Sequence, residues 1–189
     1  MIISAPSGAG KDTVIDRLVT TLPDAVTYVT ATSRKPRKGE THGVHYYFYE
    51  PEKFRAEIEQ GNFLEWSMVH GEFKGVRRDI LADTLREHPV VLVLPDPQGM
   101  RKIKSQLPEA LTIFIMPPSV EALRKRLDRR GTETPEQLAV RLRNAEIEMA
   151  ATPEYDYVVV NEDGKIDETV NEIAEIITKE SKRPRHYRL

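Results

Sequence analysis

The sequence begins MIISAPSGAGKDT (residues 1–13), and this stretch indicates the fold class. Its apolar start predicts a short buried strand, a loop of small residues follows, and Lys11 opens a helical pattern. Gly8 and Gly10 allow backbone conformations closed to other residues, so successive N–H groups can converge on an anion. The positive end of the helix and the charge of Lys11 point at the same place. The stretch therefore predicts a loop that holds the phosphates of a nucleoside triphosphate.

This loop departs at two positions from the usual pattern of phosphate-binding loops, G-x-x-x-x-G-K-[ST]. Ala5 replaces the first glycine, and Asp12 replaces the Ser or Thr whose hydroxyl normally ligates Mg²⁺. Asp12 could serve the metal directly or through water, although a carboxylate near phosphates also repels them. Thr13 keeps a hydroxyl at the next position. A glycine-rich turn that only caps a helix is the alternative, but Lys11 and the preceding strand favour the nucleotide.

The composition excludes several classes of protein. The length of 189 residues predicts one ordinary domain, with room for inserted lobes. Its net charge of -2 gives no field that would favour binding to a nucleic acid polymer. The absence of cysteine excludes disulfides and thiolate metal sites. No apolar run approaches the ~20 residues of a membrane span and no signal peptide precedes Met1, so we expect a cytoplasmic protein with no membrane partner.

Helical and strand patterns alternate along most of the chain. Strands are expected at about 1–3, 25–30, 63–69, 90–94, 111–116 and 157–161. Helices are expected at about 11–22, 51–60, 77–87, 99–106, 119–130, from about 136 onward, and 166–179. This alternation predicts an α/β fold of the P-loop NTPase type, a three-layer structure with a parallel sheet flanked by helices. Residues 33–86 interrupt the alternation and are interpreted as an inserted substrate lobe with its own short strands.

A second informative stretch is TSRKPRKGETHGVHYYF (residues 32–48). Arg34 and Arg37 flank a proline that holds the chain extended, so both guanidinium groups can be aimed at one anion. Tyr46 brings a phenol toward the same region. A solvated basic loop is the alternative interpretation.

Two acidic residues stand in or after apolar strands. Glu65 lies inside the run 63–69, where it is either on the solvent face or an acceptor in a pocket, and the solvent face is the commoner case. Asp96 follows the apolar run 90–94, at the position where open α/β sheets bind their ligands.

A basic helix precedes a glycine-containing loop at 131–136. Its charged residues are Arg124, Lys125, Arg126, Arg129 and Arg130. They could be a solvated helix end that matches the helix dipole. In a protein with a phosphate-binding loop, this segment favours a lid that closes on phosphates.

Taken together, these segments resemble the guanylate kinase family over nearly the whole chain. The most specific segment is that at 32–46, and the segments at 63–66, 117–119, 130–133 and 160–161 also resemble family segments in the same order. The resemblance implies a kinase with a core (1–32, 87–125 and 151–180), a GMP-binding lobe (33–86), a mobile lid (126–150) and a loose tail (181–189). It implies transfer of the γ-phosphoryl group of Mg-ATP to GMP or dGMP.

The resemblance also implies three groups of site residues and a metal site. Phosphoryl transfer would depend on Lys11, Arg34, Arg126, Arg130 and Arg141. ATP would be bound by Ser7, Gly8, Ala9, Gly10, Lys11, Asp12, Thr13 and Asn161, the last touching adenine. GMP would be bound by Thr30, Arg34, Arg37, Tyr46, Glu65, Lys74 and Asp96, with Glu65 accepting the N1–H and 2-amino protons of guanine. Mg²⁺ would be held near Asp12 and Asp96.

Three further positions depart from the family pattern. Leu94 stands where the family usually has the first Asp of an Asp-x-Asp pair, and Asp12 is a hypothetical replacement for that charge. Lys74 replaces a Tyr that would help to hold the GMP phosphate, and Val76 replaces a Ser that helps to read guanine. Two alternatives stay open, namely a kinase of another phosphorylated small molecule such as a ribose bisphosphate, and a non-catalytic module that binds phosphoproteins.

Overall fold

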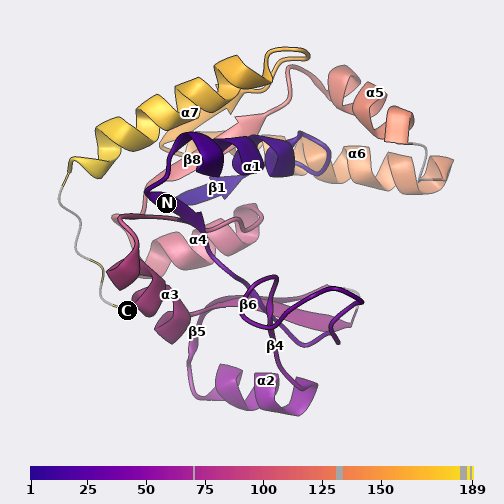
Figure 1. Ribbon diagram of the computed structural model, residues 1–189. Coiled ribbons are helices and arrows are strands. Elements are labelled where there is room, and N and C mark those ends of the chain that lie inside the picture. The colour runs from indigo at the N-terminus through magenta and orange to yellow at the C-terminus, as the bar shows by residue number, and fades with distance from the viewer. Residues whose placement is uncertain (70, 131–133, 184–186, 188) are drawn as a thin grey trace.

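A parallel sheet forms the centre of the molecule (Figure 1). The computed structural model describes residues 1–69, 71–130, 134–183, 187 and 189. The strands are β1 (Ile2–Ser4), β2 (Ala25–Thr27), β7 (Val90–Leu92), β8 (Thr112–Met116) and β9 (Tyr157–Val160). Pairing gives β2–β7 and β1–β8–β9, all parallel, and a parallel bridge between Ile2 and Val93 joins the two groups. The α/β fold with a parallel sheet is therefore confirmed.

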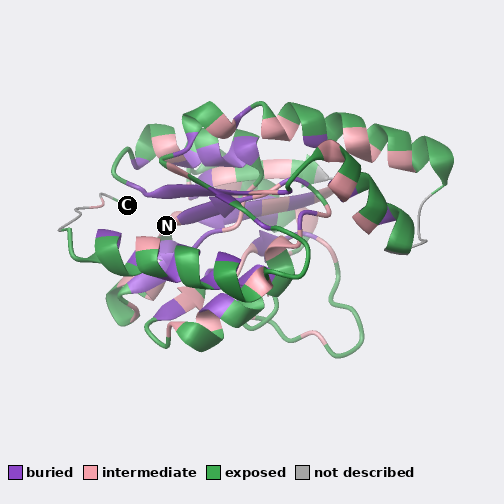
Figure 2. Cartoon of the chain, turned by 90° about the horizontal axis from the view of Figure 1, so that it is seen from above, coloured by how far each residue is buried: buried purple, intermediate pink, exposed green. Residues whose placement is uncertain are grey.

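Helices cover both faces of this sheet, because the strands are apolar on both sides. On one face lie α1 (Lys11–Thr21) and α7 (Ile166–Ser181), and on the other α3 (Arg78–Glu87) and α4 (Pro97–Gln106) (Figure 1). Seen from above, the central strands are buried while the outer faces of the helices are exposed (Figure 2). Two buried clusters result, one through α1 and α7 and one through α3 and α4.

Between β2 and β7 the chain forms a separate lobe with its own sheet. Its strands are β3 (Ala31–Thr32), β4 (Tyr47–Phe48), β5 (Phe63–Val69) and β6 (Glu72–Arg77), in the order β4-β3-β6-β5. Helix α2 (Pro51–Glu59) covers this sheet. The lobe has its own aromatic centre, in which Phe54 stacks on Phe63 at 4.4 Å and on Phe73 at 5.3 Å between ring centroids. The lobe sheet begins at Ala31, two residues before the expected start of the lobe at residue 33, and Leu81 of α3, inside the expected interval, packs into the core cluster around α3 and α4.

Two helices lie beside the loop at the start of α1, namely α5 (Val120–Arg130) and α6 (Pro135–Met149) (Figure 1). Leu123, Leu127 and Ala145 bury the contact between them. The Ser119 hydroxyl accepts a hydrogen bond from the N–H of Ala122 at 3.0 Å, as the capping pattern predicts. Residues 131–133, which contain part of the expected lid loop, lie outside the described residues.

The end of the chain was expected to be loose from residue 181. Helix α7 ends at Ser181, and Tyr187 packs, partly buried, against the core cluster around α3 and α4. The short 3-10 helix η1 (Thr152–Glu154) connects α6 to β9. None of the helices described is long and apolar enough to cross a membrane.

Candidate active site

The loop between β1 and α1 has the geometry of an anion cradle. Gly8 and Gly10 both have φ near +91°, in the left-handed region that favours glycine. A Cβ on Gly8 would lie 2.8 Å from a methyl of Leu127, and one on Gly10 would lie 2.8 Å from the side-chain nitrogen of Asn161. Within the described chain no side chain caps the start of α1, so its first N–H groups remain available to an anion.

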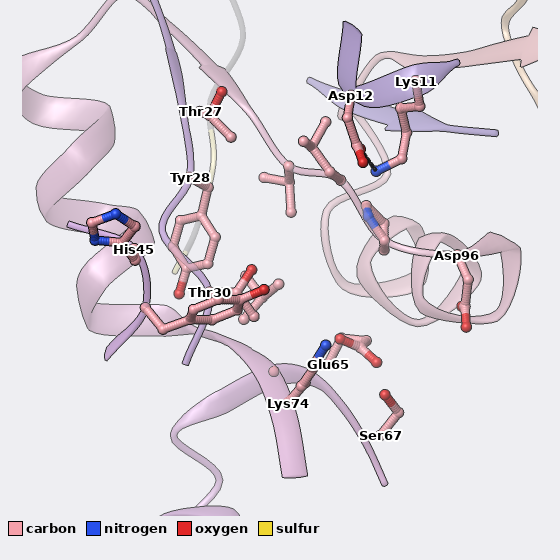
Figure 3. A pocket seen from close by; sticks show the side chains of 16 residues that line it. Lys11, Asp12, Thr27, Tyr28, Thr30, His45, Glu65, Ser67, Lys74 and Asp96 are labelled. Carbon is pink, nitrogen blue, oxygen red and sulfur yellow. Dashed lines mark ion pairs between the residues drawn. The ribbon is translucent and has the colours of Figure 1, made fainter. Parts of the chain in front are cut away.

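Lys11 and Asp12 begin α1 at the mouth of this loop (Figure 3). The Lys11 ammonium is largely buried, which lowers its pKa, while the nearby Asp12 carboxylate acts in the opposite direction. Lys11 Nζ lies 3.9 Å from Asp12 Oδ1. The Asp12 side chain is 94% exposed, so its oxygens face the open side of the loop.

A cleft of about 460 Å³ joins the loop to the lobe. Figure 3 shows Lys11 and Asp12 on one side of it and Glu65, Ser67 and Lys74 on the other. Seven of the residues expected at the site line it: Lys11, Asp12, Thr30, Tyr46, Glu65, Lys74 and Asp96. The fold therefore brings the phosphate loop and the expected acceptor residues to one cavity, although they are far apart in the sequence.

The lobe side of the cleft is built from paired residues of β5 and β6. Glu65 lies opposite Val76, and Ser67 lies opposite Lys74. Because side chains alternate along a strand, these four residues face the cleft together. Val76 is buried and offers apolar surface only. Glu65, which an isolated reading of the sequence would place toward solvent, thus faces a pocket.

The Glu65 carboxyl lies against the start of α4. A Cβ on Gly99 would be 3.2 Å from Glu65 Cδ, so the glycine leaves room for the carboxyl. Burial raises the pKa of Glu65 to about 7; the nearby Asp96 adds to this shift and Lys102 opposes it. Asp96 caps α4, since its Oδ1 accepts a hydrogen bond from the N–H of Gly99 at 2.7 Å.

Arg34 is held by a carboxylate of its own loop. Its two terminal nitrogens donate to Glu40 at 2.6 and 2.5 Å, and its guanidinium lies 4.8 Å from the ring centre of Tyr46. Glu40 also accepts from the backbone N–H of Arg37 at 2.7 Å. These bonds lower the pKa of Glu40 to about 2. Arg34 lines a neighbouring hollow of about 650 Å³ instead of the main cleft, and Arg37 is exposed.

The other residues expected to bind ATP or to take part in phosphoryl transfer differ in how far they are buried. Ala9 and Asn161 are buried, and Arg126 faces the back of the loop. Arg141 lies on α6, whereas the side chain of Arg130 is outside the part of the chain that the structure describes. Ser7 and Thr13, the other two residues expected to bind ATP, are exposed.

Sequence reasoning missed several residues that line the cleft. Ser67 follows Glu65 by two positions, and the alternation of a strand could have placed it on the same face. Thr27 and Tyr28 stand at the end of β2, at the same sheet edge as Asp96. His45 is next to Tyr46 in the sequence.

Glu148 was also missed, because it lies in the helical pattern of α6 without any motif. Its carboxyl is about half-buried beside Asp96 and the backbone N–H of Ser7. Burial and the charge of Asp96 raise its pKa.

Two other positions that depart from the expected sequence patterns have apolar surroundings. Ala5 and Leu94 are partly buried and pack against the core cluster around α1 and α7. Leu94 also lines the cleft, so apolar surface lies where the family pattern usually has a carboxylate.

Comparisons with known sequences agree on one family. The family model for guanylate kinase matches residues 1–180. The chain is 39% identical over 183 residues to a guanylate kinase of Caldanaerobacter subterraneus subsp. tengcongensis, covering 97% of this chain and 88% of that protein. It is 41% identical over 181 residues to a guanylate kinase of Haemophilus ducreyi, covering 95% and 87%.

Solved structures support the same grouping. The crystal structure of guanylate kinase from Anaplasma phagocytophilum matches with a TM-score of 0.72 and 36% identity, over 96% of this chain and 85% of that one. Shikimate kinase from Bacteroides thetaiotaomicron matches with a TM-score of 0.50 and 15% identity, over 94% and 96% of the chains. The second match shows the fold alone.

Proposed function

The chain belongs to the guanylate kinase family, and we propose that it transfers the γ-phosphoryl group of ATP to GMP or dGMP. The observation that carries the proposal is the single cleft in which Lys11 of the phosphate loop faces Glu65 of the lobe. A kinase for nucleoside monophosphates needs these two elements within one cavity. The proposal rests on this geometry together with family membership.

ATP binds at the loop end of the cleft. The uncapped N–H groups at the start of α1 hold its β- and γ-phosphates, together with Lys11. Burial of the ammonium strengthens this contact, because fewer water molecules compete for the phosphate oxygens. Arg130 and Arg141, from the two helices beside the loop, neutralise charge on the group in transfer.

The guanine base binds against the lobe. Glu65, as a carboxylate, accepts hydrogen bonds from guanine N1–H and the 2-amino group, a pair of donors that adenine lacks. Val76 contributes packing to the base and no hydrogen bond. Thr30 lies at the O6 side of the base and Asp96 near its edge. Both residues line the same cleft.

The acceptor phosphate binds between the lobe and the loop. Lys74 lines the cleft as a point charge, and its Nζ lies 5.8 Å from the ring centre of Tyr46. Arg34 lies against Tyr46 and is oriented by Glu40; it lines the neighbouring hollow in this conformation and would have to turn toward the cleft to contact the phosphate. Arg37 completes the set from the exposed edge of the loop.

The residues at the loop fit a magnesium ion that arrives with ATP. The described residues contain no group of three or more His, Cys, Asp or Glu that could hold a metal, which agrees with a magnesium ion bound by one or two carboxylates, phosphates and water. Asp12 offers exposed oxygens beside Lys11, and Asp96 lies at the other wall of the cleft. When bound, the ion neutralises phosphate charge.

The protein supplies no nucleophile in this reaction. A phosphate oxygen of the acceptor attacks the γ-phosphorus, and the bond from the γ-phosphorus to the β–γ bridging oxygen breaks. Catalysis therefore depends on positioning and on stabilising charge, which are the roles of Lys11 and the arginines.

A substrate panel tests the proposal. Initial rates with ATP and Mg²⁺ are measured for GMP, dGMP, AMP, UMP and a ribose bisphosphate. GMP and dGMP should have by far the highest kcat/KM, and Glu65→Gln should lower that value for both. A preference for the ribose bisphosphate, unaffected by Glu65→Gln, would show that the acceptor is not a nucleotide. Failure to bind any ATP analogue would instead favour a non-catalytic binding module.

A further inference from the structure

One backbone carbonyl behind the phosphate loop accepts two side-chain hydrogen bonds. Arg126 Nη1 donates to the carbonyl oxygen of Ala9 at 3.0 Å, and Asn161 Nδ2 donates to the same oxygen at 2.8 Å. Both donors come from outside the loop, one from α5 and one from the end of β9. The Thr169 hydroxyl lies 3.3 Å from Asn161 Oδ1, with the carbonyl oxygen of Lys165 as an alternative acceptor at the same distance.

The Arg126 guanidinium is bound on all of its nitrogens. Besides Ala9, it donates through Nη2 to the carbonyl of Asn161 at 2.6 Å and through Nε to Asp163 at 2.9 Å. Its side chain is only 13% exposed. The guanidinium therefore faces the back of the loop in this conformation. It does not present a free fork to a phosphate in the cleft.

The direction of the Ala9 carbonyl determines the direction of the next N–H. In a trans peptide the C=O of Ala9 and the N–H of Gly10 point in opposite directions. Holding the carbonyl behind the loop therefore turns the Gly10 N–H toward the anion. A reversed peptide would instead aim a carbonyl oxygen at the phosphates. Gly10, with φ near +91°, has little steric barrier against such a reversal.

We propose that Arg126 and Asn161 are positioning residues that lock the Ala9–Gly10 peptide in its phosphate-binding orientation. The proposal assigns Arg126 a role different from neutralising the transferred group, and Asn161 a role different from touching adenine. It rests on the proposed function only in requiring that an adenine nucleotide binds this loop. Neither residue needs to contact the nucleotide.

Nucleotide affinities distinguish these roles. The dissociation constants of ADP, ATP and IDP are measured by calorimetry without an acceptor, for the parent, Arg126→Lys and Asn161→Ala. Loss of one hydrogen bond to the Ala9 carbonyl should raise the dissociation constants of ADP and ATP by the same factor, about tenfold. Lysine should fail to rescue Arg126, because a single ammonium cannot bridge the Ala9 and Asn161 carbonyls as the planar fork does.

Asp163→Asn is the matched control. It weakens the third bond of Arg126 but leaves both bonds to Ala9, so ADP affinity should change by less than about threefold. Thermal midpoints establish that each variant is folded, and if one of the two test variants does not fold, the other decides.

Three results would overturn the proposal. Unchanged ADP affinity with a lower kcat would make Arg126 a contact of the transferred group, because ADP lacks the γ-phosphate. Weaker ATP binding with unchanged ADP binding would have the same meaning. If Asn161→Ala weakens the binding of ADP much more than the binding of IDP, Asn161 would contact the 6-amino group of adenine.

Discussion

Lys11 combines a functional charge with a structural cost. Its ammonium is largely buried, and burial lowers its pKa, which means that the folded protein disfavours the charge that the phosphates require. A residue of this kind is retained for activity and not for stability.

We therefore predict opposite effects of Lys11→Met on rate and stability. The kcat should fall by about 10²–10³-fold, because a major charge contact to the phosphates is lost. The thermal midpoint without nucleotide should stay the same or rise. Steady-state kinetics and thermal unfolding measure the two quantities. A rate close to that of the parent would show that the loop does not hold the phosphates through Lys11.

We predict that Asp12 helps to bind Mg²⁺ and does not cap helix α1. Its side chain is 94% exposed and Gly10 is the N-cap residue of α1, so capping does not explain Asp12. In Asp12→Asn we expect the Mg²⁺ concentration for half-maximal activity to rise severalfold, with little change in ATP affinity measured without metal. Asp16→Asn is the control, because it removes the same charge one turn further along α1. An equal loss of ATP affinity in the presence and in the absence of Mg²⁺ would contradict this role.

Glu65 predicts a pH dependence of acceptor binding. Its pKa of about 7 means that a large part of the carboxyl is protonated near neutrality in the free protein. Guanine needs the carboxylate, so the KM for GMP should fall roughly tenfold between about pH 6 and about pH 8. The phosphate of GMP also titrates near pH 6. Comparison with Glu65→Gln isolates the contribution of Glu65, and identical pH profiles for the two proteins would contradict it.

The same pKa has a consequence for stability with the opposite sign. The folded protein holds the Glu65 proton more tightly than the unfolded chain, whose value is near 4.5. Between about pH 4.5 and 7, stability from this residue therefore decreases as the pH rises.

The sequence predicted those parts of the site that depend on local pattern. Gly8, Gly10 and Lys11 are recognisable because a strand, a glycine loop and a helix follow one another directly. The surroundings of Arg126 were not predictable, because its partners Ala9 and Asn161 are 117 and 35 positions away along the chain. The pocket position of Glu65 depended likewise on Gly99, whose missing side chain gives the carboxyl its space.

Helix and strand positions were close to expectation, with errors mainly at the ends. Helix α4 begins at Pro97, two residues earlier than its pattern suggested, because Asp96 caps it. Strand β2 ends at Thr27. The backbone N–H of Tyr28 still donates to the carbonyl of Leu92 in β7, and the chain then turns into the lobe. Periodicity identifies an element, whereas its ends depend on tertiary contacts.

Strand β6 and helix α3 meet at Arg77, which connects the lobe to the core. Its guanidinium donates to Asp79 at 2.9 and 2.7 Å and to Glu57 of α2 at 2.7 Å, and it lies 5.2 Å from the ring centre of Tyr49. Arg77 is 7% exposed. One side chain thus fixes α2, β6 and α3 relative to one another.

Replacing this arginine should loosen the junction of the three elements. We expect Arg77→Met to lower the free energy of unfolding by about 3 kcal/mol, because it leaves Glu57 and Asp79 without their cation. The control Arg86→Met removes an exposed arginine paired with Asp83 on α3, and should cost less than about 1 kcal/mol. Urea unfolding of the three proteins measures the difference. Equal costs for the two variants would show that Arg77 does not stabilise the junction.

In the described residues the apolar cluster of the lobe is separate from the two clusters that cover the faces of the core sheet. In the lobe, Phe54 is fully buried between Phe63 and Phe73. Because Phe54 belongs to the lobe cluster and to neither core cluster, removing its ring should affect the two nucleotide sites unequally.

We predict that Phe54→Ala separates the two sites. The cavity should cost the lobe about 3–5 kcal/mol, and binding of GMP should be lost while an ATP analogue still binds. Hydrogen exchange should speed up in residues 31–76 and stay slow in β1 and β8. The control Phe114→Ala removes a buried ring from the core and should impair both sites. Equal losses of ATP and GMP binding in Phe54→Ala would show that core and lobe unfold together.

The chain leaves the core and returns to it at neighbouring points, since the backbone N–H of Arg77 donates to the Tyr28 hydroxyl at 2.8 Å. A segment whose two ends lie this close can be exchanged without displacing the strands on either side. We therefore expect that the lobe can be replaced as a unit, provided that the new segment keeps apolar residues at the positions of Leu64 and Val76, which pack against the core. A lobe that binds another phosphorylated acceptor could be inserted between Tyr28 and Arg78. The same phosphate loop would then bind ATP for the phosphorylation of a new substrate. Evolution within this architecture could change specificity by the same route.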